Sequence, residues 1–473
     1  MIKSKSKSKP KTKSKKHKKP AVVKKPIKLK TKTKTKTKTK VKKPKCSKRI
    51  YLDNNGSTNI NDKVHEVWSS WGKCYNPSID SKFAKPSRNL LQKTRDDILA
   101  HCGVSTATHM AIFNEGGSEG NNFIIRACVR AYRKKLKERD SNLLPHIIIS
   151  AMEHKSIIQC VKDLEKFGEV SASYIQPTIY GNILPSDVEQ EIRPNTCLIS
   201  IMYANNEVPV INNIRQIGEI AHKKSIPLHS DCVQIFGKYK INILSDNIDV
   251  LTASAHKFYG PKGAGLLIIS NDLVSGYSLT GEISGSQQYG LRGGTENIPN
   301  IAGLMTAVKL VFKKRKEKNK KLAKMREHVL TELSKSYSIV PYETYLGNKR
   351  KNKKKVLEIV SLGPPKEKKG FILPNTLLLA ICKNKGKPFC NVKLKHYLDK
   401  KGIIISVGSA CNTDDKNASH VLTAIGAPDV IKRGVIRISF GDENTISEIN
   451  EFLKHLKKGI EQQCKDVRIN DEV

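Results

Sequence analysis

Short apolar runs alternate with helical stretches over residues 62–270. Strands that alternate with helices are typical of βαβ units, in which helices cover both faces of a mostly parallel sheet. The runs that predict strands lie at residues 110–113, 146–150, 196–202, 227–229 and 250–253. A further run at 266–269 closely follows a glycine-rich turn and predicts an antiparallel return strand. The pattern therefore predicts an α/β fold that begins near Arg49 with a short strand.

The pattern changes after residue 300. A lysine-rich amphipathic stretch at 301–336 predicts one or two helices. Its apolar stripe contains Leu304, Val308, Val311 and Phe312. Beyond it, strand-like runs mix with helical segments, which predicts a smaller α+β domain. The predicted strands are 357–360, 377–381, 403–405 and 435–439, and the predicted helices are 391–400 and 446–463. Basic segments at 349–355 and 364–369 are interpreted as surface loops.

Charge is distributed unevenly along the chain. The 473 residues carry a formal net charge of +43, and residues 1–48 contain 23 lysines and no acidic residue. Lys-Ser and Thr-Lys repeats with few core-forming residues predict a disordered tail. Such a run attracts polyanions, so nucleic acid, an acidic protein and an anionic surface are candidate partners. A solvated tail without a dedicated partner is the alternative.

Eleven cysteines are scattered singly, without a Cys-x-x-Cys pair or histidines at metal-ligand spacing. This favours a reducing compartment and argues against a disulfide framework or structural zinc. No apolar run reaches the length of a membrane span, and the N-terminus has no apolar signal core. We therefore expect an intracellular protein in the cytoplasm, and the lysine-rich tail leaves a nuclear location open.

Two segments far apart in sequence carry the most informative chemistry. Residues 254–263 place Lys257 after a predicted strand, where partial desolvation lowers a lysine's pKa and frees its amine to form an imine. Residues 406–411 place Cys411 in a Gly- and Ser-containing loop, which suits a mobile thiolate nucleophile. Together they indicate an electron-sink cofactor on the lysine and a sulfur nucleophile that arrives from elsewhere.

Other polar residues follow other predicted strands. Asp231 could keep a pyridinium nitrogen protonated or cap a helix, and Gln234 could donate to a phenolic oxygen. Gly117 and Ser118 open a helix whose backbone N–H groups could bind an anion. His154 could stack on a planar ring or move protons. Because open α/β sheets bind ligands at the carboxyl ends of their strands, we expect these residues to form one site.

This set of segments resembles the class V aminotransferase superfamily of pyridoxal-phosphate enzymes, and most closely the NifS/IscS-type cysteine desulfurases. The resemblance covers about residues 51–456, apart from an insertion at about 347–374. Residues 254–263 are similar to the pyridoxal-lysine motif nearly residue for residue, and residues 406–411 to the catalytic-cysteine loop. Further segments similar to family motifs are 51–55, 202–207, 290–297, 419–422 and 435–440.

The resemblance implies the fold type I of pyridoxal-phosphate-dependent transferases, with a mostly parallel seven-stranded sheet in a large domain and a smaller α+β domain after it. Three parts are expected: a tail at 1–48, a large cofactor-binding domain at 49–310, and a small domain at 311–473 that carries the cysteine loop and the basic insertion. Residues 49–65 could pack with the small domain instead.

The family implies a role for each matching residue. Lys257 would carry pyridoxal phosphate, Asp231 would pair with the pyridine nitrogen, and His154 would stack on the ring and help Lys257 move protons. Gln234 and Asn206 would lie near the phenolic oxygen and the substrate. Phosphate ligands would be Gly117, Ser118, Ser254, His256 and, from the other subunit, Thr295.

Arg437 would bind the substrate carboxylate through a two-pronged contact that lysine could not make. The resemblance implies a homodimer that removes sulfur from L-cysteine, giving L-alanine and a persulfide on Cys411. The sulfur acceptor would be an iron–sulfur scaffold or a tRNA-thiolation enzyme. No resident metal is expected, although Cys411 could transiently ligate an iron–sulfur cluster. The alternatives are a selenocysteine lyase or another class V enzyme, and an inactive polyanion-binding protein that uses the tail.

The chain departs from the family pattern at two positions with a bearing on the site. Tyr289 stands where the family has an arginine in its Gly-Gly-Gly-(Gln/His)-Glu-Arg-Gly segment, and Asp442 replaces the usual arginine after the Ser-Phe-Gly of 439–441. These changes bear on the dimer contacts and on the charge of the site.

Overall fold

Seven strands form the larger sheet of the computed structural model, which describes residues 49–347, 357–365, 367, 371–383, 389–408 and 419–465. In spatial order they are β2 (His109–Asn114), β8 (Gly265–Ser270), β7 (Val250–Ser254), β6 (Leu228–Asp231), β5 (Thr196–Ser200), β3 (His146–Ser150) and β4 (Ser171–Ile175). β8 runs antiparallel to β2 and β7, and the other four pairings are parallel. The predicted α/β class, the mostly parallel seven-stranded sheet and the antiparallel return strand are confirmed.

Helices cover both faces of this sheet because successive strand residues point to opposite sides. Ile148 of β3 lies in one apolar core, whereas Ile147 and Ile149 lie in another. The Ile148 core contains residues of α1 (Asp62–Ser70), α2 (Lys85–His101), α5 (Pro185–Gln190), α6 (Ile214–Lys223) and α8 (Ile298–Lys313). The opposite core contains residues of α3 (Gly117–Lys137), α4 (Lys155–Lys166) and α7 (Asn271–Tyr277). Both faces are therefore apolar, as the near-continuous apolar runs predicted.

The edge strand β4 and helix α5 were not predicted. β4 has the sequence Ser-Ala-Ser-Tyr-Ile, and three of its five residues are only partly buried. An edge strand of this kind lacks the continuous apolar run that marked the central strands. The sequence signal was too short and too polar to separate it from a loop.

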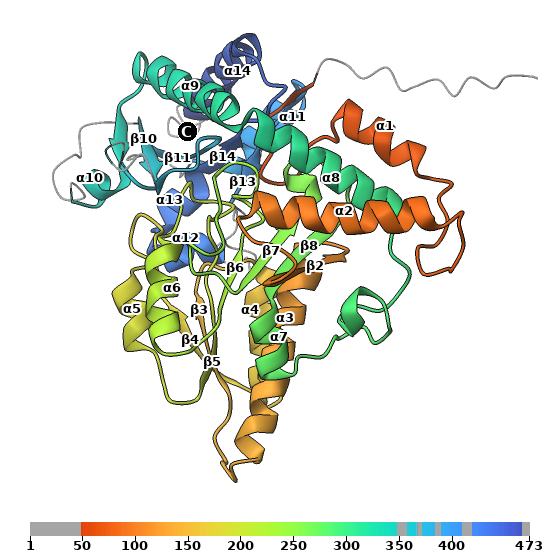
Figure 1. The fold of residues 1–473 in the computed structure, drawn as a ribbon. Coiled ribbons are helices and arrows are strands. Elements are labelled where there is room, and N and C mark those ends of the chain that lie inside the picture. Colours follow the sequence, from red (N-terminus) through yellow and green to blue (C-terminus); the bar gives the residue numbers. More distant parts are fainter. Residues whose placement is uncertain are drawn as a thin grey trace, which may run out of the picture. The chain divides into compact units, whose positions relative to one another are not determined.

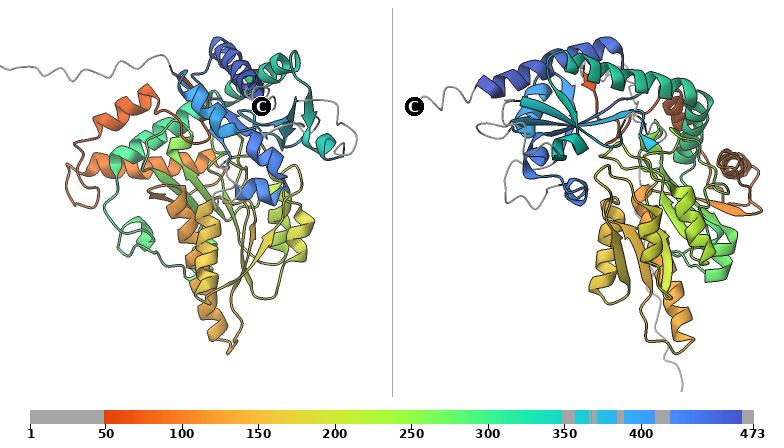
Figure 2. Two further views of the ribbon diagram at one scale, coloured as in Figure 1. Left: turned by 180° about the vertical axis from the view of Figure 1, so that it is seen from behind. Right: turned by 90° about the vertical axis from the view of Figure 1, so that its left-hand side faces the viewer.

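A second, five-stranded sheet contains β13 (Ser406–Val407), β14 (Val435–Ser439), β11 (Thr376–Lys383), β10 (Leu357–Leu362) and β9 (Ile339–Pro341), in this order. One of its faces packs against α9 (Arg315–Ser334), α11 (Asn391–Asp399) and α14 (Ile446–Lys465), and Figure 2 shows α9 and α14 lying over it. The other face meets α12 (His420–Ala424) and α13 (Asp429–Gly434). The predicted smaller α+β part is confirmed.

The N-terminal strand belongs with this second sheet in space. β1 (Ile50–Tyr51) pairs in parallel with β12 (Ile403–Ile404), and Ile50 and Leu52 lie in the same apolar core as α9 and α14. Figure 1 shows the red start of the chain beside the blue C-terminal elements. β1 and β12 form a separate two-stranded sheet, and Asp53, shortly after β1, bridges to Ser439 of β14 in the second sheet. The domain boundary at 310 stays a prediction.

The lysine-rich stretch predicted as one or two helices forms two, α8 and α9, which break at Lys314. α8 starts where the Asn297 side chain accepts a hydrogen bond from the backbone N–H of Asn300, which caps the helix. The short elements left are η1 (Ala255–Lys257), η2 (Gln288–Gly290) and α10 (Tyr342–Gly347). Among the described helices, none is long and apolar enough to cross a membrane.

Several predictions fall on parts of the chain outside the described residues. These are the tail at 1–48, the basic loop at 349–355, much of the one at 364–369, and Cys411 with the rest of 409–418.

Candidate active site

Polar residues that follow four strands meet at the carboxyl edge of the larger sheet. Lys257 follows β7, Asp231 ends β6, His154 follows β3, and Gly117 follows β2 at the start of α3. These four strands run in the same direction, so their ends lie along one edge. Asn121 of α3 donates from Nδ2 to Asp231 Oδ2 at 2.8 Å, which joins the helix after β2 to the end of β6. The expected convergence of these residues is therefore present.

Lys257 is held at this edge by backbone carbonyls of the N-terminal segment. Its Nζ donates to the carbonyl oxygens of Asn55 at 2.5 Å and Gly56 at 2.8 Å. Burial and then the positive charge of Arg437 lower the pKa of Lys257 to about 8, while Asp53 and Asp231 oppose the shift. A lysine with this pKa has a substantial neutral fraction near pH 8, so its amine can act as a nucleophile.

Asp231 is buried and both of its oxygens accept hydrogen bonds. Oδ2 accepts from Asn121, and Oδ1 accepts from the backbone N–H of Val233 at 2.9 Å. Each carboxylate oxygen has a further lone pair, so Asp231 can also accept from a ligand N–H. Gln234 is buried as well, but its Nε2 donates to the Asn55 carbonyl at 3.0 Å, and its Oε1 has no hydrogen-bond partner among the described residues. Nε2 carries a second N–H, so Gln234 can donate to a phenolic oxygen while it keeps its bond to Asn55.

His154 caps α4 with its ring. Nδ1 accepts from the backbone N–H of Ser156 at 3.2 Å, so in the neutral ring the proton lies on Nε2. The side chain stays accessible, yet the surrounding protein lowers its pKa by desolvation, which Asp231 opposes and the charges of Lys257 and His420 reinforce. A neutral, accessible imidazole beside Lys257 can accept a proton near neutral pH.

The predicted phosphate ligands lie around the start of α3 and the end of β7. A Cβ atom on Gly117 would lie 2.7 Å from Cγ2 of Val233 and 3.9 Å from Cβ of Ser254, so this close approach requires glycine. The first turn of α3 leaves backbone N–H groups for an anion. Ser118 is exposed there, and Ser254 is buried beside it.

His256 is the remaining predicted phosphate ligand on this chain. Its Nδ1 lies 3.1 Å from Oγ of Ser57, and burial, followed by the charges of Lys257 and Lys262, lowers its pKa to about 4. His256 is therefore neutral at pH 7. Thr295 is exposed and lies between η2 and α8, so its expected role in another subunit's site stays a prediction.

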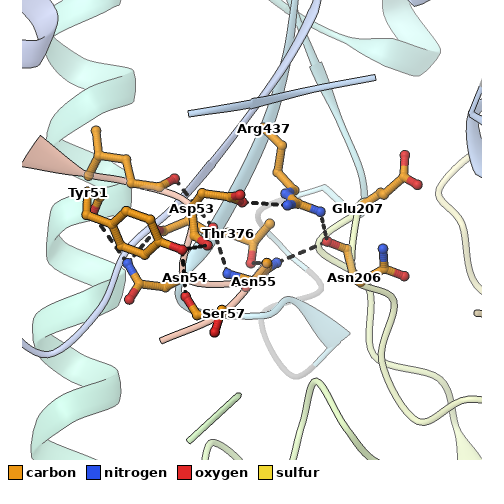
Figure 3. A network of polar contacts seen from close by, with 12 residues as sticks. Tyr51, Asp53, Asn54, Asn55, Ser57, Asn206, Glu207, Thr376 and Arg437 are labelled. Carbon is orange, nitrogen blue, oxygen red and sulfur yellow. Dashed lines mark hydrogen bonds and ion pairs between the residues drawn. The ribbon is translucent and has the colours of Figure 1, made fainter. Parts of the chain in front are cut away.

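Arg437 of β14 brings the second sheet into the site. Its Nη1 donates to the Asn206 carbonyl at 2.9 Å, and its Nη2 forms an ion pair with Oδ1 of Asp53 at 2.5 Å (Figure 3). Arg437 is only 9% exposed, and its Nε has no hydrogen-bond partner among the described residues. Asn206 contributes its carbonyl here, which also accepts from Nδ2 of Asn55 at 3.2 Å.

The chain on either side of the cysteine loop is anchored near these groups, although Cys411 itself lies outside the described residues. Before the loop, Ser406 of β13 pairs with Arg437. After it, Oγ of Ser419 donates to Oε2 of Glu207 at 2.6 Å, and Nε2 of His420 lies 2.8 Å from the Glu153 carbonyl. Residues 409–418 therefore leave and rejoin the described chain beside the site.

Sequence reasoning missed Asp53, Asn55, the buried Glu153 and the partly buried Lys238. Burial, with Asp231 reinforcing it, raises the pKa of Glu153 to about 8, and burial with Lys257 lowers the pKa of Lys238 to about 7. Their contacts join segments far apart in sequence, so no local pattern could reveal them. The sequence offered one signal, which was the position of two of these residues. Glu153 directly precedes His154, and Asp53 lies in a segment that resembles a family motif.

The two departures from the family pattern have partners in the fold. Asp442 forms an ion pair with Lys318, and its backbone N–H donates to Oη of Tyr259 at 2.8 Å. Asp442 and Lys257 line the same pocket, so the change in charge lies next to the site. Tyr289 has a φ of 63°, and its ring lies 4.7 Å from Cζ of Arg95 in a cation–π contact.

Comparisons with known proteins agree with this site. The Aminotransferase class-V family matches residues 50–360. The chain is 31% identical to the cysteine desulfurase IscS of Dictyoglomus turgidum over 417 residues, which covers 88% of this chain and 95% of that relative. It is 33% identical to the cysteine desulfurase IscS of Methanosarcina thermophila over 410 residues, covering 86% and 91%. A solved NifS-like protein superposes with a TM-score of 0.72 at 27% identity, covering 88% of this chain and 100% of that one.

A family match of this length, over a fold whose strand-end lysine lies beside a buried aspartate, defines a class-V aminotransferase. The chain belongs to that family, and within it to the NifS/IscS-type cysteine desulfurases, which depend on pyridoxal phosphate. The residues present fit this cofactor. Lys257 offers an amine of lowered pKa, Asp231 offers buried acceptors for a ring N–H, and the glycine at 117 leaves room beside Ser254. Among the described residues, no group of histidine, cysteine, aspartate and glutamate side chains could hold a metal ion.

Proposed function

We propose that this chain is a cysteine desulfurase that takes sulfur from L-cysteine, releases L-alanine and leaves a persulfide on Cys411. One observation carries the proposal. The pKa of Lys257 responds to Arg437 and to Asp231, so a nucleophilic amine, a cation for a carboxylate and a buried anion lie within electrostatic range of one another. An amino acid needs these three groups when it reacts on a pyridine-based cofactor.

The cofactor supplies an electron sink for the charge that develops on the substrate's Cα. Lys257 would hold the cofactor through its amine, and this amine, together with His154, would move the Cα proton of the substrate. Asp231 would keep the pyridine nitrogen protonated, and Arg437 would orient the substrate through its carboxylate. Gly117, Ser118, Ser254 and His256 would hold the phosphate.

Cys411 then attacks the substrate sulfur as a thiolate. The bond between Cβ and sulfur breaks as the bond between the two sulfurs forms, so the enzyme gains a persulfide. The electron pair left on the three-carbon fragment takes up protons, and L-alanine leaves. Atoms and electrons balance without an added oxidant or reductant.

The same residues would also bind L-selenocysteine, which is the closest alternative substrate. We expect a homodimer in which Thr295 completes the phosphate site of the other subunit. The persulfide passes to an acceptor protein, either an iron–sulfur scaffold or a tRNA-thiolation enzyme. The tail at 1–48 is proposed to bind a polyanion such as nucleic acid and could direct the protein to the nucleus.

The test uses purified protein loaded with pyridoxal phosphate. Wild type should show the absorption band of the bound cofactor and release alanine from L-cysteine. Lys257→Ala should lose the band and the activity, whereas Cys411→Ser should keep the band and stop desulfuration. A wild-type protein that takes up no cofactor and makes no alanine contradicts the proposal. Faster turnover of L-selenocysteine, with no persulfide formed from L-cysteine, would favour the alternative.

A further inference from the structure

A four-residue turn directly after β1 lies between Arg437 and Lys257. It consists of Asp53, Asn54, Asn55 and Gly56, and we call it the Asp53 turn. The backbone N–H of Gly56 donates to the Asp53 carbonyl at 3.0 Å, which closes the turn. The backbone N–H of Asn55 donates to Oγ of Ser439 on β14 at 2.9 Å, so the turn is fixed to the strand that carries Arg437.

The first residue of the turn holds the guanidinium group of Arg437. Asp53 accepts from Nη2 of Arg437, and the Asn206 carbonyl accepts from Nη1. Asn55 supports the second contact, because its Nδ2 donates to the same Asn206 carbonyl (Figure 3). With both ends of the guanidinium group held, the buried Nε–H is left without a partner. A buried donor in this state is costly to leave unpaired, and an incoming carboxylate would satisfy it.

The last two residues of the turn hold the other reacting group. The carbonyls of Asn55 and Gly56 both accept from Nζ of Lys257. One short segment therefore contacts the cation that would bind the substrate carboxylate and the amine that exchanges with the substrate amine. In an α-amino acid these two substrate groups are attached to the same carbon, so the spacing between Arg437 and Lys257 decides whether both can be met.

We propose that the Asp53 turn is a positioning element that sets the spacing of Arg437 and Lys257, and thereby selects substrates with an amine and a carboxylate on one carbon. The roles of Arg437 and Lys257 rest on the proposed function. Asp53 acts through Arg437 and is a positioning residue.

The turn also has a steric requirement that gives a second, independent variant. A Cβ atom on Gly56 would lie 2.6 Å from Oδ2 of Asp53, a distance that forces one of the two to move. Gly56→Ala should therefore displace the Asp53 carboxylate without removing its charge.

The first experiment compares ligands with and without a carboxylate. Asp53→Ala should raise the KM for L-cysteine by about 10-fold or more, the effect of losing a hydrogen bond to a charged group, with little change in kcat. The affinity of the holoenzyme for L-alanine, measured by calorimetry, should fall by the same factor. Cysteamine has the amine and thiol of cysteine but no carboxylate, so its affinity should change less than about 2-fold, since it makes no contact with Arg437.

The second experiment separates orientation from charge. Asp53→Asn keeps an acceptor for Nη2, so it should recover the affinity for L-alanine to within about 3-fold of wild type. Because the Asp53 charge helps to raise the pKa of Lys257, both Asp53 variants should shift the pH midpoint for uptake of pyridoxal phosphate by the apo protein to below the midpoint measured for wild type. Gly56→Ala should lower the affinity for L-alanine as much as Asp53→Ala does, although the Asp53 charge is still present. Asp97→Asn removes a carboxylate paired with lysines of α2 and α8 and serves as the matched control.

Two results would overturn the proposal. Equal losses for L-alanine and cysteamine in Asp53→Ala would mean a general structural role, and tighter binding of L-alanine would mean that Asp53 competes with the substrate. The proposed function fails separately, if wild type makes no alanine from L-cysteine. In that case the L-alanine affinities of the variants still test the role of the Asp53 turn. If the wild-type holoenzyme does not bind L-alanine, the role proposed for the turn is wrong.

Discussion

At the scale of single residues, burial changes which side chains are charged around the site. The pKa of Lys257 falls to about 8, that of His256 falls to about 4, and that of Glu153 rises to about 8, each mainly because the protein removes water from the charged form. Glu153 is fully buried, and its Oε1 accepts from Oγ of Ser150 at 2.5 Å and from the backbone N–H of Met202 at 2.9 Å. The Glu153 carboxyl group is therefore largely protonated and uncharged at pH 7, although charged groups lie near it.

This protonation predicts a pH-dependent effect of Glu153→Gln on stability. The folded-state pKa of about 8 lies above the ordinary value of 4.5, so the folded chain binds an extra proton between these pH values. Wild type should lose up to about 1.4 kcal/mol of unfolding free energy per pH unit across this window relative to Glu153→Gln, which stays neutral. Thermal melts of both proteins at pH 5, 7 and 9 measure the difference. If the stabilities of wild type and Glu153→Gln change with pH in the same way, Glu153 is ionised in the folded protein and the prediction is wrong.

At the scale of elements, short contacts join the two sheets where the cysteine loop returns. Ser419 caps α12 by accepting from the backbone N–H of Leu422 at 3.2 Å, and it also donates to Glu207, which follows β5. His420 contacts the carbonyl of Glu153, which follows β3. The first turn of α12 is thus attached to the ends of two strands of the larger sheet.

A double-mutant cycle on Ser419 and Glu207 tests this attachment. Ser419→Ala should destabilise the protein by about 1–3 kcal/mol, because it removes both a helix cap and a hydrogen bond to a charged group. Glu207→Gln should cost less, and the double variant should cost less than the sum, since the two residues share one bond. Chemical unfolding of the four proteins gives the coupling energy. Additive losses would mean that the contact contributes nothing to stability.

At the scale of the whole molecule, much of the positive charge lies at one end of the sequence. Residues 1–48 hold 23 of the lysines, whereas the residues that form the site carry balanced charges, such as Arg437 with Asp53. The lysine-rich segment therefore lies outside the part of the sequence that contains the predicted site residues.

Deleting residues 1–48 should remove binding to a DNA duplex without affecting catalysis. The full chain should bind with an affinity that falls steeply between about 50 and 200 mM salt, because each lysine–phosphate contact releases a counterion. The shortened chain should lose most of this affinity and its salt dependence, while alanine release stays within about 2-fold, since the tail contributes no predicted site residue. Fluorescence anisotropy at several salt concentrations measures the binding. Equal affinities of the two chains would place any DNA contact on residues 49–473.

The central strands, the strand-end positions of Lys257, Asp231 and His154, and the class of chemistry could be predicted from the sequence. Apolar runs bounded by glycines and polar residues are local signals, and parallel strands bring their ends to one edge wherever they occur in the chain. The edge strand β4, the pairing of β1 with β12 and the acid Glu153 could not be predicted, because each depends on neighbours that are remote in sequence.

By itself, the sequence predicted which residues would supply the chemistry, because a lysine after a strand, a thiol in a glycine-containing loop and a basic tail are properties of residue type and local context. Only the tertiary structure decided what those residues contact. Asp53 and Arg437 are 384 positions apart, yet they share an ion pair because Asp53 forms a β-bridge with Ser439 of β14, the strand that carries Arg437. That long-range packing sets the charge, the spacing and the pKa of the groups that meet the substrate.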